Sequence, residues 1–440
     1  MSHDMSTAKM PPLSKMFRGG TGIVFVLLCL MYFILYVDRV NLSMAAPIIK
    51  AEFHLSNTEL GFVLSAFGYC YAAFQIMGGF AGDRFGGRVV LGILLFLCAA
   101  GTMLIGLSGG IMSLVFARML VGLGEAGTFP NGARVISAWV PLVRRGFALG
   151  FVHSAARLSA ALTPPIVVAL MYITGWRGAF IVLGIVSLLW AISWSFYFRD
   201  DPSKHKHVTQ AELAQLPPYE PCGPRSAQVP WRKLLLRLMP VTLVYFCQAW
   251  TLWLYLSWLP TFFKQSYHLD LKQSALFSSA VFAAGVIGNT IGGLLTDSIY
   301  RHTSSLTKAR RNTILAGLSC SLLCLIFVLF LRNLTPLAVA LSGALFFLQA
   351  CEGALWSVPV DIAPKVAGAA SGIMNTAAGV AAIISPVAFG AIADLTGSYR
   401  IPFIASIFLL AVGIGITFFI RADVKLEEHQ REPNSSVIVN

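Results

Sequence analysis

GFAGDRFGGR, residues 79–88, joins two long apolar runs in the first quarter of this 440-residue chain. Its glycines let helices and backbone pass closely, and Arg84 and Arg88 favour the cytoplasmic side of a membrane. The runs on either side are about 20 residues long, which is the length that a bilayer core demands. The stretch therefore indicates a short polar loop between two membrane-spanning helices.

The whole composition agrees with this interpretation. Hydrophobic residues make up 57% of the chain and charged residues only 12%, with a mean hydropathy of +0.74. A soluble globular chain has about 25% charged residues, so a soluble protein is excluded. Apolar runs predict an all-α membrane protein with twelve transmembrane helices, near residues 21–46, 58–80, 89–108, 111–135, 147–172, 178–198, 236–260, 273–298, 312–331, 335–360, 366–393 and 401–420.

The chain repeats itself internally, which divides the twelve helices into two sets of six. A shift of 214 residues places Asp83 on Asp297, and a shift of 222 places Pro164 on Pro386. A polar, proline-containing stretch separates the two copies. We therefore expect a cytoplasmic tail at 1–20, a six-helix bundle at 21–198, a cytoplasmic linker at 199–234, a second bundle at 235–420 and a cytoplasmic tail at 421–440.

The net charge of +13 could suggest a nucleic-acid partner. Most of the lysines and arginines, however, lie in the tails and in loops on the same side as the tails. Such a bias orients a membrane protein with its positive loops inside the cell. We interpret the basic charge as a topology signal, predict cytoplasmic termini and expect no nucleic-acid partner.

Twelve spans, the repeat and the loop at 79–88 together resemble the major facilitator superfamily. In that family the acid at the Asp83 position caps a helix and pairs with basic groups, with Arg84 and Arg88 beside it, to hold one conformation. The resemblance also implies a substrate site near the bilayer midplane between two six-helix bundles, with transport by rocking of one bundle against the other.

A narrower resemblance lies in three pieces: YVDRVN at 36–41, RMLVGLGEAG at 118–127 and GWR at 175–177. Together they are similar to the anion:cation symporter branch, which includes bacterial proton-coupled carriers of galactonate, hexuronate and aldarate sugars. The resemblance implies that Asp38 and Glu125 handle protons and that Arg39 faces the substrate. It further implies a substrate contact from Tyr71, and hydrogen-bond donors and an aromatic platform from Gln248, Tyr255, Trp356, Ser357 and Asn375. Tyr36 is a further candidate because it lies just before the Asp38 pair.

Charges inside the apolar spans carry an independent argument, since each costs on the order of 2.5–3.5 kcal/mol to keep in hydrocarbon. Counting along the helices at about 1.5 Å per residue predicts an outer pair, Asp38 with Arg39 or Arg118, and a central pair, Glu125 with Arg157. A substrate carboxylate that competes with Glu125 for Arg157 would favour protonation of Glu125 and couple anion to proton. The alternative is that these pairs are static struts that lock the helices together, and that Asp38 with Arg118 forms a strut or a gate rather than a proton site.

Two features depart from the branch. Arg157 stands where the sugar-acid carriers tend to have an aromatic residue, which could indicate a dicarboxylate or an aromatic acid. Glu352 is an extra intramembrane acid without an assigned partner. Galactonate, glucuronate, tartrate and phthalate-like acids therefore all stay open, as do proton and sodium coupling.

The sequence predicts a secondary transporter in the cell membrane, by preference a bacterial inner membrane, that imports a small organic anion such as a sugar acid by proton symport. We expect no enzyme activity, no metal, no cofactor beyond the proton gradient, and a monomer. A drug or cation exporter of the same fold is the alternative, which two membrane arginines disfavour.

Overall fold

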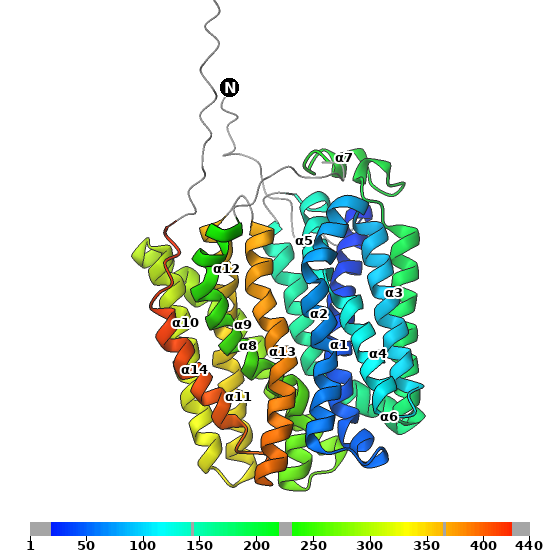
Figure 1. Cartoon of the computed structure of the whole chain (residues 1–440). Helices are drawn as coiled ribbons and strands as arrows, with labels where there is room; N and C mark the ends of the chain where they lie inside the picture. Colours follow the sequence, from blue (N-terminus) through cyan, green and yellow to red (C-terminus); the bar gives the residue numbers. More distant parts are fainter. Residues whose placement is uncertain (1–18, 142–144, 220–230, 364–366, 425–440) are drawn as a thin grey trace, which may run out of the picture.

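The computed structural model describes residues 19–141, 145–219, 231–363 and 367–424. All regular elements in these ranges are helices, and Figure 1 shows most of them as long rods that run along one common direction. The first half contains α1 (Gly19–Glu52), α2 (Asn57–Phe85), α3 (Gly87–Gly106), α4 (Ile111–Glu125), α5 (Thr128–Trp139) and α6 (Arg145–Tyr197). The linker holds a 3-10 turn (Pro202–Lys204) and α7 (Gln210–Leu213), and the second half contains α8 (Trp231–Tyr267), α9 (Leu271–Thr303), α10 (Leu306–Phe330), α11 (Leu334–Ala350), α12 (Glu352–Ile362), α13 (Ala367–Thr396) and α14 (Phe403–Thr417).

These helices make twelve crossings, which confirms the predicted fold class. Nine helical stretches of the described chain are long and apolar enough to span a membrane, and α4 with α5, like α11 with α12, forms one such stretch. Helix α6 supplies two crossings because the chain turns at Gly175, whose φ of 70° is left-handed. Helices α2 and α14 complete the set.

The two ends of the bundle differ. One end, here called the linker end, carries the start of α1 and the linker with α7, at the top of Figure 1. The other, the far end, carries the turns that follow α1, α3, α8 and α10. At the linker end Asp200 accepts a hydrogen bond from the backbone N–H of Arg88 (3.1 Å), and Arg88 Nε donates to the carbonyl oxygen of Ser195 (2.9 Å). These bonds tie the start of α3 to the end of α6.

The loop at 79–88 becomes the end of α2 and the start of α3. Its turn centres on Gly86, whose φ of 86° favours glycine. The Arg84 guanidinium lies 5.5 Å from the centre of the Phe85 ring, and the Arg84 side chain is exposed. The side chain of Asp83 lies outside the described residues, so its predicted capping and gating role stays a prediction.

Contacts between the halves run mainly along two helix pairs, α2 against α13 and α6 against α9, with a smaller contact between α1 and α8. Small residues allow the α2–α13 approach: a Cβ added to Gly68 would lie 2.8 Å from Ile383 Cγ1. At the far end the carboxylate of Asp394, on α13, accepts four hydrogen bonds from Asn57 and Thr58 at the start of α2, at 2.6–3.1 Å. An acid from one half thus caps a helix of the other half and holds the far end together.

Candidate functional site

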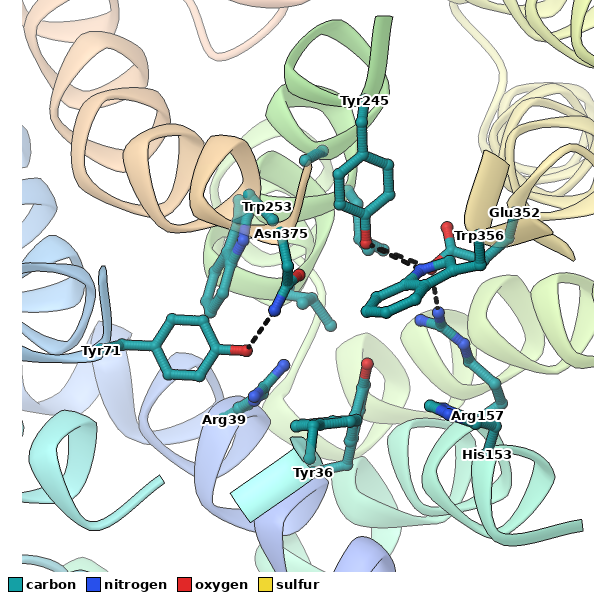
Figure 2. A pocket seen from close by; sticks show the side chains of 15 residues that line it. Tyr36, Arg39, Tyr71, His153, Arg157, Tyr245, Trp253, Glu352, Trp356 and Asn375 are labelled. Carbon is teal, nitrogen blue, oxygen red and sulfur yellow. Dashed lines mark hydrogen bonds and ion pairs between the residues drawn. The ribbon is translucent and has the colours of Figure 1, made fainter. Parts of the chain in front are cut away.

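A small cavity lies between the two halves, walled by helices of both (Figure 2). Its volume is about 40 Å³, room for roughly three water molecules. It is lined from the first half by Tyr36, Arg39, Tyr71, Phe129, His153 and Arg157, and from the second by Tyr245, Ala249, Leu252, Trp253, Leu256, Glu352, Trp356, Asn375 and Ala378. Two cationic groups and several aromatic rings therefore face one enclosed space.

Helix breaks bring the two acids of the site to mid-span. Helix α4 ends at Glu125, and the chain turns through Gly127, whose φ is 82°, before α5 begins. A Cβ on Gly127 would lie 2.6 Å from the backbone of Gly78, so only glycine fits against α2 here. In the second half the helix is interrupted at Cys351, between α11 and α12, and Glu352 is the first residue of α12. Each half thus interrupts its fourth crossing beside a carboxylate.

Glu125 pairs with Arg39 and not with Arg157, so the predicted central pair is wrong. Arg39 Nε donates to Glu125 Oε2 at 2.7 Å, and both side chains are more than nine-tenths buried. The contact is one-sided: among the described residues, Arg39 Nη2 has no acceptor and Glu125 Oε1 has no donor. A buried guanidinium beside the cavity therefore keeps an unused N–H group.

Aromatic rings surround the Arg39 guanidinium. Its central carbon lies 4.9 Å from the ring centres of Tyr36 and Tyr71, 5.3 Å from Phe129 and 5.9 Å from Trp253. Rings stabilise a cation through their negative faces and exclude water from it. The charge is thus held in place by its surroundings before any ligand arrives.

Arg157 pairs with Glu352, which gives the unplaced acid a partner. Arg157 Nη2 donates to Glu352 Oε1 at 2.7 Å, and Figure 2 shows this contact at the edge of the cavity. Glu352 also accepts from Gln248 Nε2 (2.8 Å), Trp356 Nε1 (3.1 Å) and the Tyr245 hydroxyl (3.4 Å). Because Arg157 lies on α6 and the other four lie on α8 and α12, this ion pair joins the two halves.

Counting residues along the helices predicted the wrong pairs because it places only the backbone, whereas the pairing depends on where the charged ends of the side chains lie. Side chains lean toward the N-terminus of their helix. Helix α1 starts at the linker end, so Arg39 leans from its position toward the middle of the span and meets Glu125 at the end of α4. Arg157 lies on α6, which packs against α9 of the other half. This packing brings Arg157 within reach of Glu352, the first residue of α12 in that half.

Asp38 lies outside the cavity lining, in a polar cluster behind α1. Its carboxylate accepts hydrogen bonds from Asn41 Nδ2 (3.1 Å), Cys98 Sγ (3.3 Å), Thr102 Oγ1 (3.0 Å) and Ser187 Oγ (3.4 Å). Within the described part of the chain no ion pair joins this carboxylate to an arginine, so the predicted outer pair is also wrong. Arg118 instead donates to the backbone oxygen of Asp38 at 3.0 Å.

The remaining predicted residues divide by position. Tyr36, Tyr71, Trp356 and Asn375 line the cavity, and Asn375 Nδ2 donates to Gln75 Oε1 (3.0 Å) and to the Tyr71 hydroxyl (3.4 Å) across the α2–α13 contact. Gln248 is fully buried and reaches the site through Glu352. The Ser357 hydroxyl donates to the carbonyl oxygen of Gly353 in its own helix, and Ser357 is absent from the lining.

Sequence reasoning missed Tyr245, Trp253 and Phe129, which contribute rings to the walls. An aromatic residue in an apolar span is usually packing, so nothing in the pattern marked these three. Their helices could have been suspected, because α8 carries the already predicted Gln248, and α5 follows Glu125 directly.

The geometry suits reversible binding of an anion. Two arginines with spare N–H groups can grip carboxylate or sulfonate oxygens, and both are held by carboxylates that a ligand could replace. The described residues contain no group of three or more metal-ligating side chains. The cavity thus offers charge and hydrogen bonds for a small ligand.

Comparisons with known proteins show the family of this chain. The Major Facilitator Superfamily model matches residues 28–386. A probable sulfoacetate transporter of Cupriavidus necator is 45% identical over 401 residues, covering 90% of this chain and 93% of that protein. A probable L-galactonate transporter of Escherichia coli is 32% identical over 402 residues, covering 88% and 87%.

A solved structure agrees in fold. The bacterial homologue of the human lysosomal transporter Spinster, in an inward-facing and occupied conformation, gives a TM-score of 0.75 at 15% identity and covers 90% of this chain and 96% of its own. The matched family model and the relatives are transporters rather than enzymes, as the sequence predicted. The chain belongs to the major facilitator superfamily and is a multi-pass membrane transporter.

Proposed function

We propose that this protein imports a small organic anion together with protons, by alternating exposure of the cavity between its two halves. One observation carries the proposal. Arg39 is buried at the cavity wall and binds Glu125 through Nε alone, which leaves Nη2 without an acceptor among the described residues. An unsatisfied buried donor on a permanent cation is a receptor for an anion.

Proton coupling follows from what happens to Glu125 when an anion arrives. The anion accepts hydrogen bonds from Arg39 and competes with Glu125 for the guanidinium. Glu125 is fully buried, so without its arginine its charged form is costly and it takes up a proton. Anion and proton then cross together, and release of the anion returns Arg39 to Glu125 and expels the proton. Asp38, the residue before Arg39 in the chain, is the candidate carrier of a second proton.

The direction of transport rests on charge placement. Lysines and arginines concentrate at the linker end, so this end faces the cytoplasm and both termini are cytoplasmic. With a proton gradient directed into the cell, symport is uptake. The bacterial sources of the relatives suit a bacterial inner membrane, and one chain provides the whole cavity, so a monomer suffices.

The preferred substrate is a compact acid of the sulfoacetate kind. The relative with this name is 45% identical over nine-tenths of the chain, which favours a compact acid of the same kind. Sugar acids are the second candidate, favoured by the L-galactonate relative. A cation exporter is disfavoured because the two arginines that face the cavity would repel a cationic drug.

Uptake into proteoliposomes tests the proposal. Purified protein is reconstituted, and accumulation of labelled sulfoacetate, galactonate, glucuronate and tartrate is followed with an inward proton gradient, with a sodium gradient, and with neither. We expect accumulation of at least one acid above its external concentration with the proton gradient alone. Accumulation driven only by sodium, or none of any acid, would overturn the proposal.

A further inference from the structure

Building on the proposed function, we infer that Arg157 binds a second anionic group of the substrate and that Glu352 occupies Arg157 while the site is empty. The protein then prefers short dianions, with two acidic groups separated by a single carbon, over monoanions. Arg157 and Glu352 are specificity-determining residues in this account, and Arg39 is the receptor common to all substrates.

The first step is the position of Arg157. It lines the same cavity as Arg39 and is more than nine-tenths buried. Glu352 is the one acceptor that the described residues offer it, through Nη2 alone. Its other N–H groups have no hydrogen-bond acceptor among the described residues and are available to a ligand in the cavity. Figure 2 shows Arg157 beside Glu352 at the edge of the cavity.

The second step is the distance between the two arginines. Both guanidinium groups lie against the Tyr36 ring, with the central carbons of Arg39 and Arg157 at 4.9 and 5.5 Å from its centre. The two carbons can therefore be no farther apart than the sum of these distances. A guanidinium carbon lies about 4 Å from the centre of the acidic group that it grips. Both arginines can therefore hold one small dianion at the same time, and acidic groups on the straight line between them would be at most roughly 2–3 Å apart, a spacing that one CH2 group provides.

The third step is the state of Glu352 after displacement. A dianion on Arg157 removes one of the four donors that hold this carboxylate. Gln248, Trp356 and Tyr245 still donate to it, so it is not left unsatisfied. A monoanion is already satisfied by Arg39 and gains nothing from displacing Glu352. The exchange therefore favours ligands with two acidic groups.

The molecule supplies a matched control at the far end. Arg177 Nη1 and Glu52 Oε1 form an ion pair at 2.7 Å, the same distance as in the Arg157–Glu352 pair. Both of its side chains are about 40% exposed, and they lie on α1 and α6 of one half, away from the cavity. Substitutions here change the same residue types without touching the cavity.

Binding to the purified full-length chain tests the inference, read out by intrinsic fluorescence because Trp253 and Trp356 line the cavity. The probes are two pairs in which a methyl group replaces one acidic group: sulfoacetate with ethanesulfonate, and malonate with propionate. Galactarate serves as a long dianion. Wild type is expected to bind each short dianion about tenfold or more tighter than its monoanion partner.

Variants distinguish a role of Arg157 in substrate binding from a purely structural role of the Arg157–Glu352 ion pair. Arg157→Gln is expected to reduce the dianion preference to about threefold or less while monoanion affinity stays unchanged. Glu352→Gln should strengthen sulfoacetate binding by about tenfold, because the competing charge is gone. Arg177→Gln should leave every affinity unchanged. If Arg157→Gln does not fold, Arg157→Lys, which keeps the charge but not the planar fork, is expected to give an intermediate preference.

Three results would overturn the inference: equal binding of dianions and monoanions by wild type, tighter binding of galactarate than of the short dianions, or weaker sulfoacetate binding in Glu352→Gln. Each leaves the proposed function intact if proton-driven uptake of any acid is observed. Absence of uptake for the whole panel would instead overturn the proposed function itself.

Discussion

Arg39 is the residue on which anion binding depends most, because its guanidinium is enclosed by rings and pairs with Glu125 through one nitrogen. Arg39→Lys keeps the charge but loses the planar fork and the stacking on Tyr36 and Tyr71. We expect it to weaken substrate binding by about tenfold to a hundredfold, the range of charge-assisted hydrogen bonds. A titration of purified protein measures this, with Arg177→Lys as the control. Unchanged affinity in Arg39→Lys would remove this arginine from the binding site.

At this scale the sequence predicted that Arg39 and Arg157 lie at the substrate cavity, but not which carboxylate each arginine pairs with. Charged residues are conspicuous in apolar spans because their cost is high, so Arg39, Glu125 and Arg157 could be selected without a structure. Their partners depend on side-chain lean and on contacts between the halves. The Arg157–Glu352 pair joins residues 195 positions apart through packing of one half on the other, which no spacing rule reports.

Among the elements, the break between α4 and α5 places Glu125 and depends on Gly127. Gly127 and Gly175 both have left-handed φ angles, of 82° and 70°. Only Gly127 is also pressed against another helix, since nothing lies within 4 Å of a Cβ on Gly175. Alanine costs about 1–2 kcal/mol of backbone strain at Gly127 and about 1–3 kcal/mol at Gly175, whose ψ of 171° belongs to a region that glycine alone normally adopts; the contact with Gly78 adds a steric clash at Gly127 only. We expect Gly127→Ala to lower the thermal unfolding midpoint in detergent clearly more than Gly175→Ala. Equal decreases would mean that the contact with Gly78 is unimportant.

The cap that Asp394 places on α2 is a second testable feature of the elements. The N-cap residue of α2 is Ser56. Asp394 adds acceptors for the next two backbone N–H groups, those of Asn57 and Thr58. Removing a capping acceptor costs about 1–2 kcal/mol, a factor of roughly 5–30 in a local equilibrium. Asp394→Ala should therefore speed amide hydrogen exchange at the start of α2 by a comparable factor. Asp270→Ala is the matched control, because Asp270 caps its own helix, with the Gln273 N–H 2.6 Å away. It should affect only the start of α9. Unchanged exchange at α2 in Asp394→Ala would contradict the proposed tie.

The number and order of the crossings were predictable, whereas the exact helix ends and the breaks were not: α8, for example, spans Trp231–Tyr267 where the sequence predicted 236–260. Long apolar runs gave the twelve crossings, since a bilayer requires about 20 apolar residues per helix. The interruptions after Glu125 and before Glu352 involve one or two residues with ordinary helical neighbours, so hydropathy passes over them. Gly127 needs its left-handed φ because of the neighbouring helix α2, and that contact exists only in the folded chain.

For the molecule as a whole, the two halves play unequal roles around one cavity. The first half supplies both arginines, and its Arg39–Glu125 pair is internal. The second half supplies Glu352, the hydrogen-bond donors around it and part of the aromatic wall. A sequence repeat predicts two similar bundles but cannot show this asymmetry, because neither the shift of 214 nor that of 222 residues places a charged residue opposite Arg39, Glu125 or Arg157. Rocking of the halves would leave the first ion pair intact and stretch the Arg157–Glu352 pair.

The central claim is that a bound anion takes the place of Glu125 on Arg39 and that Glu125 then takes up a proton. Binding that takes up a proton weakens as the pH rises, so the dissociation constant of sulfoacetate should increase with pH in wild type. The probe itself stays fully ionised from about pH 6 to 9, and Glu125→Gln has no carboxylate to protonate.

The most direct measurement is therefore the dissociation constant as a function of pH for wild type and Glu125→Gln, on purified protein without any gradient. We predict a rise with pH in wild type and a flat profile in Glu125→Gln. A flat profile in wild type, or the wild-type slope in Glu125→Gln, would contradict the exchange of partners.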